Sequence, residues 1–328
     1  MNRLIPFIVL IPLLVFALIV GLFMGGAAIP ASEVIDALVR YGSAGIGHTL
    51  IWEVRIPRVV SSALVGASLA GCGVVFQAVL RNPLAEPYTL GVSAGGALGA
   101  TTAIVLGLSG LPMVAWCFAG CLLSIGLVIA ISTVREFSTT TIILSGVVLS
   151  FLFSAVMMFI LSMASSRDVH ASILWLMGSL GSTRAVSAPV LALVVLPLAL
   201  VLMCFSRDLN LISLGDEKTH LLGFNPGTLK TVLLVLASLL TGICVAVSGI
   251  IGFVGLIIPH AVRKACGADH QVLLPASMLA GSSFLLLSDT LAQIIIRPFE
   301  LPVGVITGII GGVFFLAYLL KARPPEVF

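Results

Sequence analysis

Charged side chains are scarce in this chain. Asp, Glu, Lys and Arg make up 9% of its 328 residues, whereas 59% are hydrophobic. Soluble domains usually carry about 25% charged residues. A soluble fold with so few charges would expose a large apolar surface to water. The composition therefore excludes an ordinary soluble protein and predicts that lipid is the solvent.

Long basic runs and paired cysteines are also missing. The net charge is only +3, and no Lys/Arg run is long enough for a nucleic-acid surface, so no nucleic-acid partner is predicted. The six cysteines lie mostly in apolar stretches. Cys117 and Cys121 share a helix face, but sulfurs in such places are usually small core groups, so no metal site is predicted.

Two motifs of energy coupling are absent as well. The dipeptide Gly-Lys does not occur, which excludes the phosphate-binding loop G-x-x-x-x-G-K-[S/T]. Ionisable groups are missing from the centres of the apolar stretches, and Asp289 and Glu300 fall near predicted outer helix ends. A proton-coupled carrier normally places such a group deeper. The energy for any transport is therefore expected to come from another chain.

The apolar stretches predict ten membrane-spanning helices and one all-α integral membrane domain covering residues 1–328. A helix needs about 20 apolar residues to cross the hydrocarbon core. The region 231–262 is divided because Gly and Pro residues crowd its second half. The predicted spans are 4–25, 59–80, 88–107, 113–134, 138–163, 185–205, 229–248, 250–262, 271–292 and 302–320.

The basic residues support an even number of spans. Lys and Arg gather on the cytoplasmic side of membrane proteins. With both termini inside, ten of the sixteen Lys and Arg residues are cytoplasmic and six are outside. The first apolar run is longer than the core of a signal peptide, so a retained helix is expected. Two polar segments stand out: 206–226, predicted to be cytoplasmic, and 164–184, predicted to form a short outer helix.

Glycine patterns allow more than one interpretation. Gly91, Gly95 and Gly99, like the ladder 304/308/312, lie on one helix face and permit close packing. Which ladder faces a second subunit stays open. The sequence around Ser93 also matches the G-x-S-x-G pattern of serine hydrolases, for which His260 is the one plausible base. Ordinary helix packing is the favoured interpretation.

Four stretches, in order along nearly the whole chain, resemble the FecCD-type permeases of ABC importers for iron-siderophores, haem and vitamin B12. They are Arg55–Arg58, Gln77–Ser93, Gly252–His260 and Glu300–Gly304. The resemblance implies the type II importer fold with ten helices per subunit. It also implies a homodimer in the prokaryotic plasma membrane, two ATPase subunits inside and a substrate-binding protein outside. ATP and Mg would be bound by the ATPases, so this chain is expected to hold no cofactor and not to be an enzyme.

The resemblance also implies roles for particular residues. Docking of the binding protein is expected at Arg55, Arg58 and Arg297, the last replacing a family arginine where this chain has Gln293. ATPase coupling is expected at Ser213, Leu214, Gly215, Asp216, Glu217, Leu222 and Gly223. A cytoplasmic gate is expected at Asn82, Leu84, Thr139 and Thr140.

The resemblance leaves the substrate open. A ferric siderophore is favoured, with vitamin B12, haem and molybdate as alternatives. A stand-alone channel or secondary carrier is the rival function, and an intramembrane serine hydrolase comes third. Co-purification with an ATPase chain would separate the importer from the stand-alone carrier.

Overall fold

The computed structural model describes residues 4–39, 45–134, 138–181 and 187–321, and regular structure in these ranges is helical. The helices are α1 (Ile5–Phe23), α2 (Ala31–Val39), α3 (Ile46–Thr49), η1 (Leu50–Arg55), α4 (Ile56–Val79), η2 (Pro87–Leu90), α5 (Val92–Val105), α6 (Leu111–Val134), α7 (Thr139–Ser162), α8 (Ser166–Leu176), α9 (Ser187–Cys204), α10 (Ser206–Ser213), α11 (Asp216–Leu221), α12 (Pro226–Ser248), α13 (Val254–Cys266), α14 (His270–Ile294) and α15 (Val303–Lys321).

The predicted all-α integral membrane fold is confirmed. Seven helices in the described ranges are long and apolar enough to cross a membrane, and the pair α9 and α10, bent by 50°, could form an eighth span. Two further predicted spans coincide with the shorter helices α5 and α13. The predicted outer helix within 164–184 is present as α8, which Ser165 caps by accepting a hydrogen bond from the Asp168 backbone N–H.

α5 and α13 are short because the chain before each of them is not helical. Gly91 precedes α5 and Phe253 precedes α13, both in the left-handed conformation, with φ of 74° and 68°. Tyr88 joins the two breaks: its hydroxyl donates to the Ile251 carbonyl at 2.7 Å and accepts from the Ile251 N–H at 3.2 Å. Non-helical backbone within a membrane is tolerated where the protein itself satisfies its polar groups. The Tyr88 contact does this for the break between α12 and α13.

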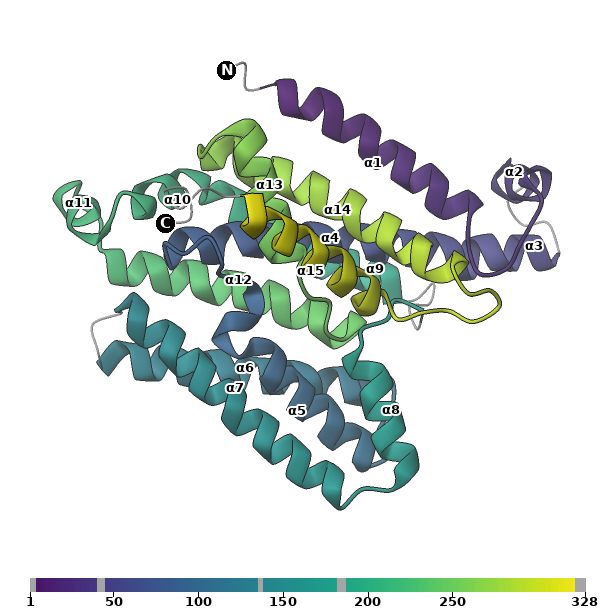
Figure 1. The fold of residues 1–328 in the computed structure, drawn as a ribbon, viewed down its shortest axis with the longest axis horizontal. Helices are drawn as coiled ribbons and strands as arrows, with labels where there is room; N and C mark the ends of the chain where they lie inside the picture. Colours follow the sequence, from purple (N-terminus) through teal and green to yellow (C-terminus); the bar gives the residue numbers. More distant parts are fainter. Residues whose placement is uncertain (1–3, 40–44, 135–137, 182–186, 322–328) are drawn as a thin grey trace.

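α4 is the central helix of the bundle (Figure 1). Most of its residues are buried against α14, α12, α13 and α9, while α5, α6 and α7 form a second layer beside α12. Glycines permit this close packing: a Cβ added to Gly73 would lie 2.0 Å from the Gly255 carbonyl oxygen. Such contacts bring helix backbones together, as in other membrane bundles.

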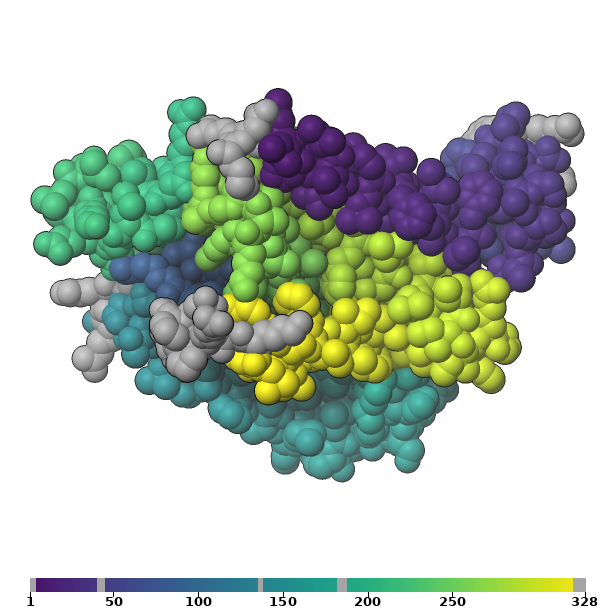
Figure 2. Space-filling model, turned by 45° about the horizontal axis from the view of Figure 1, so that its top comes forward, coloured from purple at the N-terminus to yellow at the C-terminus, as the bar shows by residue number. Residues whose placement is uncertain are grey.

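The long helices run roughly parallel, so functional segments gather at the two ends of the bundle. α10, α11 and the start of α7 lie at one end, which we call the coupling end (Figure 1). α2, α3, α8 and the α14–α15 connection lie at the opposite end, which we call the docking end. Figure 2 shows α10 and α11 protruding from the body of the molecule.

Candidate functional site

The predicted coupling residues lie on two short helices joined by glycine. Ser213 ends α10, Gly215 has a φ of 106° and turns the chain, and Asp216 begins α11. A left-handed residue at such a turn favours glycine, which has no Cβ to clash. Buried Thr219 closes the turn, because its hydroxyl lies 3.0 Å from the Leu211 carbonyl and 2.8 Å from the Gly215 carbonyl. The two helices therefore form one compact unit.

This unit exposes apolar side chains beyond the ends of the long helices. Leu221 is 80% exposed, and Leu214, Leu222 and Phe224 are also exposed. A protruding apolar cluster of this kind is typical of a protein–protein contact. Glu217 is exposed beside them. The segment therefore presents both apolar and acidic side chains to a partner at the coupling end.

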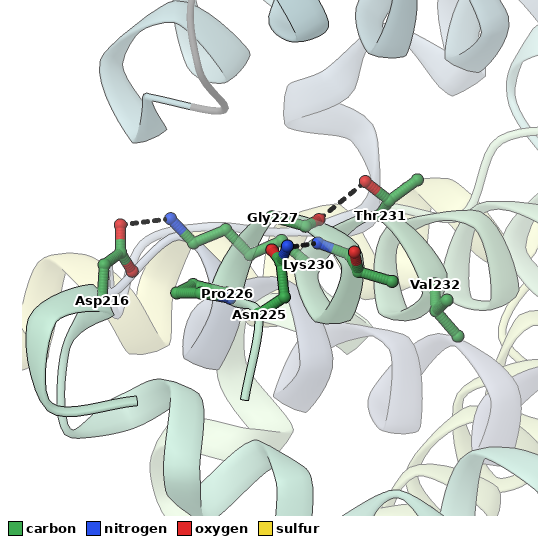
Figure 3. A pocket seen from close by; sticks show the side chains of 8 residues that line it. Asp216, Asn225, Pro226, Gly227, Lys230, Thr231 and Val232 are labelled. Carbon is green, nitrogen blue, oxygen red and sulfur yellow. Dashed lines mark hydrogen bonds and ion pairs between the residues drawn. The ribbon is translucent and has the colours of Figure 1, made fainter. Parts of the chain in front are cut away.

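Asp216 ties α11 to two other parts of the chain. One carboxylate oxygen lies 2.7 Å from Arg81 Nη2, and the other lies 2.7 Å from Lys230 Nζ (Figure 3). The Lys230 side chain is only 2% exposed, so its charge is almost fully removed from water. A cavity of about 580 Å³ lies beside this cluster, lined by Asp216, Asn225, Pro226, Gly227, Thr228, Lys230, Thr231 and Val232. Sequence analysis did not predict these ion pairs.

The predicted gate residues also lie toward the coupling end. Asn82 follows α4, and its side-chain oxygen accepts a hydrogen bond from the Leu84 N–H at 2.9 Å, which fixes a tight turn. Leu84 is exposed, and Thr139 and Thr140 begin α7. No hydrogen bond joins the Asn82 turn to these threonines in the described residues. Their joint role as a gate stays a prediction.

Glu86 connects the gate turn to the broken helix α13. Burial raises the pKa of its carboxyl group, and a hydrogen bond from the Phe253 backbone N–H opposes that rise. Phe253 precedes the first residue of α13, so the carboxylate lies at the helix N-terminus, where the macrodipole favours negative charge. Glu86 and Tyr88 thus hold both sides of the break between α12 and α13.

The three arginines predicted for docking gather at the docking end. The buried Arg55 donates through Nη1 to the Leu22 carbonyl at 2.8 Å and through Nη2 to the Ala27 carbonyl at 2.6 Å. The exposed Arg297 donates to the Gly25 carbonyl at 2.8 Å. Both therefore hold the connection between α1 and α2.

Arg58 is enclosed between two acidic side chains. Its guanidinium binds Asp289 through Nε and Nη2 at 2.8 and 2.9 Å, and Glu300 through Nη1 at 2.7 Å. The Arg58 and Asp289 side chains are 7% and 3% exposed, whereas that of Glu300 is 42% exposed. The sequence predicts a span that begins at residue 59, directly after Arg58. In the structure Pro57 and Arg58 lie in the first turn of α4, because proline is tolerated there.

Docking at these three arginines stays a prediction, and the structure shows that they differ in exposure. Arg297 is exposed and donates to one backbone carbonyl, whereas Arg55 and Arg58 are buried and have several partners inside the chain. The Arg58–Asp289 contact was missed from the sequence. An available signal was an acidic residue near the outer end of one helix and an arginine near the outer end of another, since intramembrane charges usually pair.

The hydrolase alternative has no geometric support in the described residues. Ser93 has no hydrogen bond to a histidine, and the buried Nε2 of His260 has no partner. The His260 ring packs edge-on against Tyr318, with ring centroids 4.6 Å apart. A serine nucleophile needs a base within hydrogen-bond reach. Gly91 and Gly95 instead allow α5 to pack closely on its neighbours.

Comparisons with known proteins agree with this architecture. The model of the FecCD transport family matches residues 13–321. The chain is 41% identical over 304 residues to the cobalamin import system permease protein BtuC of Halobacterium salinarum, covering 91% of this chain and 81% of that protein. It is 38% identical over 280 residues to the hemin transport system permease protein HmuU of Yersinia pestis, covering 83% and 84%.

A solved structure gives the same result. An inward-facing conformation of a metal-chelate type ABC transporter superposes with a TM-score of 0.87 at 32% identity, covering 95% of this chain and 98% of that one. These relatives are permeases, in keeping with the apolar helices found here and with the lack of a phosphate-binding loop. The chain is therefore a multi-pass inner-membrane permease of the ABC importer type and belongs to the FecCD transport family.

Proposed function

We propose that this permease forms the pathway of an importer for a metal chelate, driven by two ATPase subunits and supplied by a substrate-binding protein. The observation that carries the proposal is the protruding unit of α10 and α11, which exposes Leu214, Leu221 and Leu222 among the described residues. An ATPase docked there could move α11 and, through it, the bundle. A ligand or partner changes a conformational equilibrium only if it contacts the two states differently.

ATPase docking can be tested at the exposed leucines. Leu221→Glu and Leu222→Glu place charges in the proposed contact and should abolish co-purification of the ATPase subunit. Because both side chains are exposed, folding and thermal stability should not change. Ile46→Glu, at the exposed start of α3 at the docking end, controls for adding a charge elsewhere. Retention of the ATPase by both leucine variants would contradict the proposal.

The cargo is proposed from what the names of the relatives say they carry, because a fold by itself does not identify a substrate. The named relatives carry cobalamin and hemin, and the structural neighbour is of the metal-chelate type. A ferric siderophore belongs to the same class. The test is ATP-dependent uptake into proteoliposomes containing the permease, its ATPase and its binding protein, with radiolabelled cobalamin, haem, ferric siderophore and molybdate compared side by side. Uptake of molybdate alone would reject a metal chelate, and uptake without the ATPase would reject the importer.

We also propose that α15 forms part of a contact between two copies of the chain. Gly95 and Gly99 are used inside the subunit, since an added Cβ would lie 2.3 Å from the Gly120 oxygen and 2.2 Å from the Trp116 oxygen. An added Cβ at Gly308 or Gly312 would meet nothing within 4 Å. Exposed apolar side chains lie along α15 at Ile309, Val313, Leu316 and Leu320.

Figure 2 shows α15 lying across the surface of the molecule. Small residues on such a face allow two helix backbones to approach closely. Gly308→Cys should therefore cross-link two subunits in the membrane. Gly107→Cys, in the loop between α5 and α6, is the control and should not cross-link. Failure of Gly308→Cys to cross-link would place the second copy elsewhere.

A further inference from the structure

Arg81 occupies a backbone position that normally belongs to glycine. Its N–H binds the Ala78 carbonyl at 3.3 Å, and the next N–H, that of Asn82, binds the Gln77 carbonyl at 3.2 Å. These two bonds end α4 in the pattern known as a Schellman motif, in which the left-handed residue is usually glycine. Arg81 has a φ of 47°, and among the described residues only Phe253 is another non-glycine residue with positive φ.

A residue held in an unfavourable conformation points to a role for its side chain. The Arg81 side chain crosses from the end of α4 to the start of α11, where Nη2 lies 2.7 Å from the Asp216 carboxylate. Asp216 in turn holds the buried Lys230 on α12 at 2.7 Å. The arginine therefore connects the end of α4 to α11, 135 residues away in the sequence, and through Asp216 to α12.

The position of Arg81 makes this contact more than a local link. It directly precedes Asn82, whose side chain builds the turn that presents Leu84. Asp216 is the first residue of α11, the helix that carries the exposed leucines. A displacement of α11 would thus pull on the residue adjacent to the gate turn, without passing through the interior of the bundle.

The Arg81–Asp216 ion pair restrains the start of α11 on the side that faces α4. Gly215 allows the guanidinium to approach, since an added Cβ would lie 3.3 Å from Arg81 Nη1. On the side of Lys230, the cavity of about 580 Å³ leaves the start of α12 open (Figure 3). α11 is therefore held by the Thr219 hydrogen bonds on the side of α10 and by the ion pairs of Asp216 on the side of α4 and α12.

We propose that Arg81 is a positioning residue that transmits movement of the ATPase-facing helix α11 to the gate turn through its ion pair with Asp216. This inference rests on the proposed function, because it assumes that an ATPase docks at α11. The side chain touches neither cargo nor nucleotide. Its effect is to keep the gate turn and the coupling unit moving together.

Arg81→Gly is the main test, because glycine relieves the backbone strain while it removes the guanidinium. The pair is partly exposed, with side chains 39% and 45% accessible, so its loss should not lower thermal stability. We expect ATP hydrolysis within a factor of two of wild type, but at least a tenfold drop in cargo transported per ATP hydrolysed. Arg81→Lys should restore at least a third of that ratio, and Arg167→Ala, which removes an exposed charge from α8 at the docking end, should leave it unchanged.

Asp216→Asn is a second variant that keeps the backbone and shape of the site, but it also removes the carboxylate from the buried Lys230 and should therefore lower the Tm, which Arg81→Gly should not. It should show the same loss of transport per ATP. The double variant should transport no less per ATP than the more impaired of the two single variants. Residues that act as one unit are non-additive in this way. Normal coupling in either Arg81→Gly or Asp216→Asn, or additive losses in the double variant, would overturn the inference.

The wild-type protein, measured alongside in proteoliposomes with its ATPase and its binding protein, distinguishes failure of the proposed function from failure of this inference. Absence of ATP-dependent uptake by the wild type would refute the proposed function and this inference with it. Uptake by the wild type and equal coupling in Arg81→Gly would refute the inference alone.

Discussion

The buried contact between Arg58 and Asp289 should be the main electrostatic anchor of the docking end. The carboxylate accepts two hydrogen bonds from Arg58, a third from Ser62 at 3.3 Å and a fourth from Gln293 at 3.0 Å. Asp289→Asn keeps the shape of the side chain and removes its charge. Arg58 would then be buried with Glu300 as its remaining acidic partner.

The size of the effect follows from burial. Removing one partner of a buried ion pair typically costs about 3–5 kcal/mol. Glu300, 2.7 Å from Arg58, still compensates part of the charge, so the lower end of that range applies, about 3 kcal/mol. Glu300→Gln should cost at most about 1 kcal/mol, because this carboxylate is largely in water. With an unfolding entropy of about 2.1 cal/mol/K per residue, 1 kcal/mol lowers the Tm of this 328-residue chain by roughly 1.5 °C, so the decreases are roughly 4 °C for Asp289→Asn and at most about 1.5 °C for Glu300→Gln.

The measurement is thermal unfolding of the purified permease in nanodiscs, followed by intrinsic fluorescence. Glu53→Gln is the matched control, because Glu53 is an exposed acid at the same end of the molecule. A double variant, Arg58→Leu with Asp289→Leu, should be less destabilised than Asp289→Asn, since no unpaired charge is left buried. Equal Tm values for Asp289→Asn and Glu300→Gln would refute the assignment of the anchor to the buried pair.

Three further predictions concern docking, pH and packing. Arg297→Glu should weaken binding of the substrate-binding protein about tenfold, most strongly at low salt, because an exposed charge is reversed. The affinity is measured by surface plasmon resonance. An unchanged affinity would remove Arg297 from the docking surface. Glu86→Gln should become more stable relative to wild type as the pH rises from about 4 to about 8. Since burial raises the Glu86 pKa above 4.5, the native state holds the extra proton, and wild-type stability falls as the pH rises through the raised pKa; a pH-independent difference in Tm would contradict this. Gly95→Ala should lower the Tm because the added Cβ meets the backbone of α6, whereas Gly126→Ala, where an added Cβ meets nothing within 4 Å, should not, and equal Tm values for the two variants would contradict the packing described here.

Arg58 also limits how docking can be tested. Replacing it by Glu would place three acidic side chains around one buried site, so loss of uptake would reflect loss of folded protein. Arg297 provides the cleaner probe, because its side chain is exposed and its one described bond goes to a backbone carbonyl. The roles of Arg55 and Arg58 in docking stay predictions.

The class of protein and the positions of most of its helices follow from the amino-acid sequence. Apolar stretches of about 20 residues are a strong signal because each must satisfy its backbone hydrogen bonds internally in lipid. The same patterns identified the polar segment 206–226, whereas the family was indicated by the resemblance of four stretches to FecCD-type permeases. Short apolar pieces were harder: the division near residue 250 was predicted from glycines, but the Tyr88 contact that supports the break joins distant parts of the chain.

Which charged residues form ion pairs, and which glycines contact another helix, is seen only in the three-dimensional structure. Arg58 and Asp289 are 231 residues apart, and Arg81 and Asp216 are 135 residues apart, so no local pattern could pair them. The two glycine ladders look alike in sequence, yet Gly95 packs against α6 and Gly312 faces open space. Hydropathy fixes which segments enter the membrane because each segment interacts with lipid on its own. The partners of each side chain depend on how those segments pack against one another, and that is a property of the whole bundle.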